Sequence, residues 1–94
     1  MARSKPTDKV DREVEQRFRD NLVQFSRRQL FIEGEPEREC LEVMQWLVAG
    51  HKACRDHLEY DDIQAFVEEH AVEVKPVAVE IVERAKKAGR PNER

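Results

Sequence analysis

The chain has 94 residues, 39% of them charged, and a formal net charge of −3 at pH 7. This length favours one small domain, and no apolar run approaches the roughly 20 residues that a membrane-spanning helix needs. Two cysteines are too few for a disulfide framework, and the N-terminus lacks the apolar segment of a secretory signal. The sequence therefore predicts a cytoplasmic protein.

The charge is unevenly distributed along the chain. Residues 34–83 hold four Lys or Arg and thirteen Asp or Glu, a net charge of −9, whereas residues 1–33 and 84–94 carry +2 and +4. An acidic middle opposes nonspecific binding to nucleic acid. The charge pattern therefore disfavours a nucleic-acid partner.

The first predicted element is a long helix over residues 8–31, capped by Thr7 or Asp8 and preceded by a flexible tail, residues 1–6. Five apolar residues recur at spacings of three or four, as on one face of a helix: Val10, Val14, Phe18, Leu22 and Phe25. At 1.5 Å per residue the helix would be roughly 36 Å long. A compact domain of this size is roughly 32 Å across, so the excess length favours a homodimer.

The second predicted helix covers residues 36–49, or extends to 54. Gly34 suits the cap of the preceding helix and Pro36 the first turn of the next. With 100° per residue, the apolar side chains of residues 40–48 occupy more than half of this helix, and only Glu42 and Gln45 mark a polar side. Such an arc indicates either a central core helix or a helix with an exposed apolar face.

We expect part of this arc to bind another protein, because Trp and Met are enriched at interfaces. Trp46 lies at the edge of the arc, where an indole ring can contact a partner while its N–H keeps a polar contact. The predicted protein-binding residues are Phe31, Leu41, Met44, Trp46, Leu47 and Val48.

Two further helices are predicted, at residues 61–71 and 76–88. Asp61 or Asp62 suits the start of the third, and Pro76 suits the first turn of the fourth. Residues 72–82 are ambiguous, because their valines also alternate as in a strand. The domain would then span residues 7–89, followed by a polar tail at 90–94.

Candidate chemistry is weak. His51, Cys54 and His57 are spaced three residues apart, which on a helix spreads them over about 120°, a poor arrangement for zinc. The chain has only three glycines, too few for the loops that would build an oxyanion site beside a nucleophilic cysteine. We therefore expect no enzymatic activity, catalytic residue, metal or cofactor.

Taken together, the patterns predict an all-α bundle of about four helices with a long N-terminal helix. The function expected is that of a small regulator that binds another protein, for example an anti-activator that sequesters a transcription factor. The alternative is a small DNA-binding transcriptional regulator that uses a helix-turn-helix-like pair in residues 62–88. Glu80 and Glu83 weigh against it, because base readout favours Arg, Lys, Asn or Gln.

Overall fold

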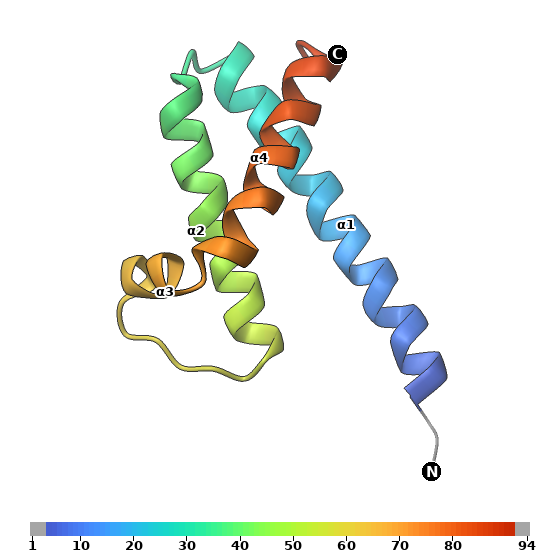
Figure 1. Cartoon of the computed structure of the whole chain (residues 1–94). Helices are drawn as coiled ribbons and strands as arrows, with labels where there is room; N and C mark the ends of the chain where they lie inside the picture. The colour runs from blue at the N-terminus through green and yellow to red at the C-terminus, as the bar shows by residue number, and fades with distance from the viewer. Residues whose placement is uncertain (1–3, 92–94) are drawn as a thin grey trace.

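The computed structural model describes the backbone of residues 4–91 and the side chains of residues 12–91. It contains four α-helices: α1 (Ser4–Phe31), α2 (Glu37–Arg55), α3 (Ile63–Glu69) and α4 (Ala71–Ala88). No strand occurs between residues 4 and 91. The predicted all-α bundle with a long N-terminal helix is confirmed (Figure 1).

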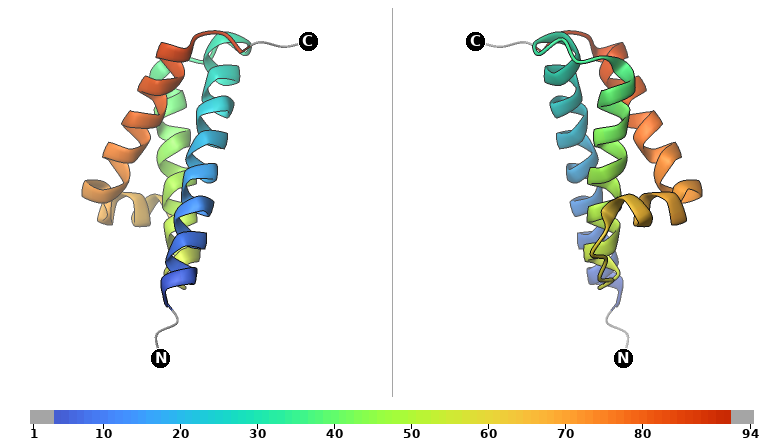
Figure 2. Two further views of the ribbon diagram at one scale, coloured as in Figure 1. Left: turned by 90° about the vertical axis from the view of Figure 1, so that its right-hand side faces the viewer. Right: turned by 90° about the vertical axis from the view of Figure 1, so that its left-hand side faces the viewer.

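Three long helices build the bundle, and the short α3 extends it at one end. α4 packs most extensively on α2 and α1, while α3 packs chiefly on α2. Figure 2 shows α1 and α2 running in opposite directions, and Figure 1 shows them diverging from the loop that connects them, with the N-terminal end of α4 beside α3. The molecule measures 49 × 32 × 20 Å, and the N-terminal half of α1 projects beyond the other helices (Figure 1).

The core lies between α1, α2 and α4 and continues to α3. Its fully buried large side chains include Met44, Phe66, Val74 and Ile81. Four alanines of α2 and α4 are also buried, and small side chains of this kind let helix backbones approach closely: Ala49, Ala53, Ala78 and Ala85.

The bounds of the first three helices differ from the predicted ones. α1 begins at Ser4, so Thr7 and Asp8 lie inside the helix and residues 4–6 are not a tail; residues 1–3 lie outside the described part. α2 continues through Gly50 to Arg55. α3 is shorter than predicted, but Asp62 caps it as expected, and its carboxylate accepts a hydrogen bond from the Gln64 N–H at 3.0 Å.

α4 begins at Ala71, so the prediction that Pro76 starts this helix was wrong, and the ambiguous residues 72–82 are helical. A proline inside a helix removes one donor to the carbonyl four residues earlier. Here that carbonyl belongs to Val72, a residue that is 88% exposed, so this turn of the helix lies at the surface. The turn before Pro76 also places Val74 in the core with no exposed area, and this burial favours the helix over a break.

Hydrogen bonds from two arginines join the C-terminal end of α4 to the C-terminal end of α1. Arg27 donates hydrogen bonds to the carbonyls of Gly89 (2.7 Å) and Arg90 (2.9 Å), and Arg90 in turn donates to the carbonyl of Phe31 (2.9 Å). Cations at these positions satisfy carbonyls that lack a helical partner at a helix C-terminus. Arg90, which belongs to the predicted polar tail, therefore contacts α1. Residues 92–94 lie outside the described part.

Candidate functional site: the exposed face of α2

The structure separates the six predicted binding residues into core and surface. Met44 is fully buried and Val48 only 8% exposed, so both are core residues and neither is available as binding surface. Phe31 and Leu41 are partly buried. Trp46 and Leu47 are 47% and 38% exposed. Only part of the wide apolar arc is thus covered by the other helices.

Uncharged residues at the surface of α2 form one stripe, which we call the α2 strip; its members are exposed except Gly50, which is half-buried: Val43, Trp46, Leu47, Gly50 and Cys54. These positions fall within an arc of about 100° and extend for about 16 Å along the helix axis. The strip contains no charged residue, although 39% of the chain is charged. A helix face exposed to water is normally polar, so this one is unusual.

Sequence reasoning missed three members of the strip. Val43, Gly50 and Cys54 share the face of Trp46 and Leu47 at helical spacing, and this uncharged pattern was visible in the sequence. The polar residue Gln45 suggested that the solvent side lay elsewhere, yet Gln45 is partly buried. Counting 100° per residue therefore gave the width of the apolar arc but not which half of it was exposed to solvent.

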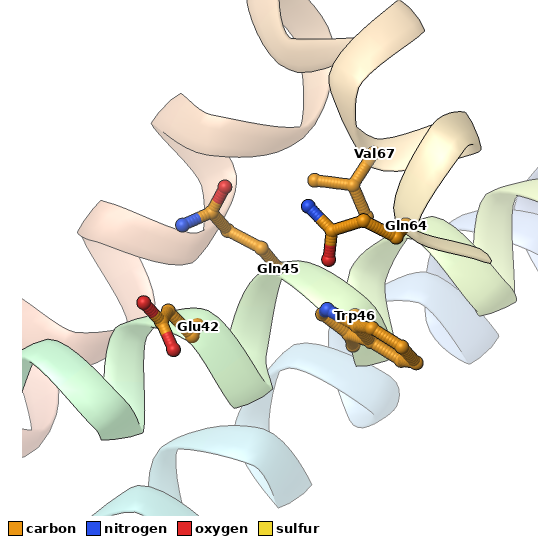
Figure 3. Close-up of a pocket in the computed structure, with 5 residues that line it drawn as sticks. All are labelled: Glu42, Gln45, Trp46, Gln64 and Val67. Atoms are coloured by element: carbon orange, nitrogen blue, oxygen red, sulfur yellow. The ribbon is translucent and has the colours of Figure 1, made fainter.

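Two shallow hollows flank Trp46. One, of about 280 Å³, is lined by Glu42, Gln45, Trp46, Gln64 and Val67. Figure 3 shows its first three side chains projecting from α2 and the other two from α3, with Gln64 and Val67 above the indole ring. The second hollow, of about 510 Å³, shares Glu42, Trp46 and Gln64 but adds Val43 and Leu47. A polar hollow thus adjoins an apolar one, with Trp46 common to both.

Negative charge borders these hollows. Among the described side chains, Glu42 has neither a hydrogen-bond partner nor an ion pair, and no Lys, Arg or His lines either hollow. At the start of α2, a hydrogen bond with Glu39, together with burial and the charges of Glu39 and Glu33, raises the pKa of Glu35. Several carboxylates therefore lie at this end of the strip; Lys86 pairs with Glu37 at 3.1 Å, whereas Glu42 has no such cation among the described side chains.

A separate polar cluster joins α1 to the last turns of α2. The Glu15 carboxylate lies 2.8 Å from Arg55 Nη1 and 3.2 Å from His51 Nε2, and the His51 ring stacks on Phe18 at 3.9 Å. Burial acts to raise the pKa of Glu15, but the hydrogen bonds and charges of His51 and Arg55 outweigh it and lower the pKa. This cluster stabilises helix packing through a partly buried ion pair.

The three residues considered as zinc ligands, His51, Cys54 and His57, do not lie together in the structure. His51 faces α1, Cys54 is exposed on the α2 strip, and His57 follows the helix with a positive φ of 58°. Within residues 12–91, no group of three or more His, Cys, Asp or Glu side chains is placed to hold a metal ion.

A buried Ser–Cys pair lies between α1 and α2. Ser26 and Cys40 both have no exposed area, and burial raises the pKa of the Cys40 thiol, while the Ser26 hydroxyl acts in the opposite direction. That hydroxyl has no hydrogen bond of good geometry among the described residues. A protonated, inaccessible thiol of this kind is unreactive.

A second apolar surface lies on the first half of α4. Ala71, Val72, Pro76 and Val79, together with Lys75, border a very open hollow of about 550 Å³. It offers no acceptor side chain that would orient a partner, so it is less specific than the α2 strip.

The arrangement around Trp46 can bind a partner by apolar contact and by ion pairing. In the described residues no helix is both long and apolar enough to cross a bilayer. No family model, no curated protein and no solved structure matches this chain.

Proposed function

We propose that this chain is a non-enzymatic protein-interaction module that regulates its partner by occupying part of the partner's surface. Sequestration of a transcription factor is one example of such regulation. The observation that carries the proposal is the α2 strip, an uncharged, exposed helix face centred on Trp46 and Leu47. Apolar side chains left together at the surface mark interaction sites more often than isolated ones do.

Two further observations support the proposal. Cys40 and Cys54 are both free thiols, which is consistent with a reducing cytoplasm. Trp46 is also the type of residue that most often contributes binding energy at the centre of an interface.

Partner capture from the source cell tests the proposal. Immobilised wild-type chain is expected to retain a protein that Trp46→Ala releases, with affinity reduced at least tenfold, as for a hot-spot truncation of about 2 kcal/mol. Val72→Ala is the matched control, because Val72 is an exposed apolar residue on α4, outside the α2 strip. If immobilised Val72→Ala loses the partner while Trp46→Ala retains it, the binding surface lies on α4 instead.

The predicted homodimer requires its own measurement. Light scattering would give twice the chain mass of 11.1 kDa for a dimer, and a mass equal to one chain would refute it.

The DNA-binding alternative gains no support from α3 and α4. A single residue, His70, separates these helices, whereas helix-turn-helix motifs use turns of three or four residues. Exposed Glu73, Glu80 and Glu83 on α4 would also repel phosphate. A salt titration decides the matter, because DNA binding would weaken steeply as salt increases.

A further inference from the structure

We infer that the α2 strip binds an amphipathic helix of another protein and that an arginine of that helix occupies the hollow between Glu42, Trp46 and Gln64. This inference rests on the proposed function and adds the chemistry of the partner. It is carried by the side chains around Trp46 (Figure 3).

The first reason is the shape of the strip. Its residues follow the i, i+3, i+4, i+7, i+11 spacing with which one helix contacts another. Gly50 lies in the middle, and a Cβ atom added there would meet nothing within 4 Å. A partner helix could therefore approach the backbone of α2 closely at this point.

The second reason is charge complementarity. Glu42 lines both hollows and has no cationic partner among the described side chains, and Glu39 stands at the N-terminal end of the strip. A cation on the flank of a partner helix would pair with Glu42 while apolar side chains of the same helix cover Val43 and Leu47.

The third reason favours arginine over lysine. A guanidinium group is planar, stacks on an indole face and offers five donors. The hollow supplies a carboxylate from Glu42, amide oxygens from Gln45 and Gln64, and the Trp46 ring. Its volume of about 280 Å³ lies just below that of small-molecule sites and suits one long side chain.

A second copy of this chain is a poorer occupant. The exposed apolar area of the strip is on the order of 300 Å², given that a whole aromatic side chain covers 150–250 Å². A standard interface covers about 800 Å² on each partner. A symmetric dimer would thus have to include the carboxylate border of the strip. Both copies would use this same surface, and no Lys, Arg or His lines either hollow to pair with Glu42 of the other copy.

Two model peptides test the inference. Both are amphipathic helices with leucines at i, i+3, i+4 and i+7; one carries a flanking arginine and the other citrulline, which has nearly the same shape without the charge. Trp46 is the only tryptophan in the chain, so its fluorescence reports binding at this hollow directly. We expect the arginine peptide to bind at least fivefold more tightly and its affinity to fall as salt is added.

The Glu42→Gln variant links the effect to the proposed carboxylate. It should weaken the arginine peptide about three- to tenfold, as expected for a charge-assisted hydrogen bond at a partly exposed site, and leave the citrulline peptide unchanged. Glu13→Gln, an exposed carboxylate on α1, is the matched control and should change neither affinity.

Three results would overturn the inference. Equal binding of the two peptides would show that apolar contact alone acts here. If neither peptide binds, yet a cellular partner is still captured and is lost from Trp46→Ala, the proposed function would stand and the inference of an arginine-bearing helix would be wrong. A dimer that Trp46→Ala converts to a monomer would show that a second copy covers the strip.

Discussion

Replacing Met44 by Ala tests the orientation of α2, on which the candidate site depends. Met44 has no exposed area and lies in the core between the helices. Truncation of a buried Met costs 2–5 kcal/mol, because transfer energy is lost and a cavity remains. Because Met44 is fully buried, we expect Met44→Ala to lower the free energy of unfolding by about 3–4 kcal/mol.

That cost is large for a domain of this size. At roughly 0.05–0.15 kcal/mol per residue, a chain of this length has a stability of about 5–14 kcal/mol. Each kcal/mol shifts the melting temperature by about 4–8 °C in small domains. Met44→Ala should therefore lower the melting temperature by at least about 12 °C.

Trp46→Ala provides the comparison on the same helix. Trp46 is 47% exposed, so only about half of the 3–5 kcal/mol for a buried Trp is expected, or about 2 kcal/mol. Urea unfolding followed by circular dichroism measures both variants without using the single tryptophan as the probe. A larger loss for Trp46→Ala than for Met44→Ala would mean that α2 is rotated relative to this structure, and the α2 strip would then be core.

Three other substitutions probe separate parts of the fold. Gly50→Ala should raise the free energy of unfolding by about 0.5–1 kcal/mol, because Gly50 is helical with open space around it; a lower melting temperature would show a contact there that the structure lacks. Ser26→Ala should be neutral or stabilising in urea unfolding, since it removes a buried hydroxyl without a well-formed hydrogen bond, and a loss above about 1 kcal/mol would contradict this. Because the pKa of Glu15 is lowered in the folded chain, its contribution is present above the ordinary pKa of glutamate and is lost as the pH falls through the lower folded value. Glu15→Gln should accordingly be less stable than wild type at neutral pH and lose less stability on acidification, and parallel pH profiles for the two proteins would refute the role of this carboxylate.

Local signals predicted the helices well where a single residue determines the boundary. Asp62 caps α3 through its own side chain, and Gly34 adopts a positive φ angle in the loop after α1. Such boundaries depend on the conformational preferences of one or two residues. They can therefore be read from the sequence.

Boundaries and faces that depend on distant contacts were not predictable in this way. Pro76 suggested a helix start, but burial of Val74 against the rest of the core extends α4 to Ala71. The exposed half of α2 was ambiguous for the same reason, since the positions of α1 and α4 decide whether Met44 or Trp46 is covered. The chemistry around Trp46 also requires Gln64, which α3 supplies from 18 residues further along the chain.

The fastening of α4 to α1 has a consequence for synthesis on the ribosome. The hydrogen bonds from Arg27 and Arg90 join residues 59 to 63 positions apart, and α4 leaves the exit tunnel after the other three helices. Until then, the faces of α1 and α2 that α4 will cover stay open to water. The nascent α1–α2 hairpin would then expose apolar surface of the kind that makes incompletely folded chains prone to aggregate, and slow translation through α4 would prolong that exposure.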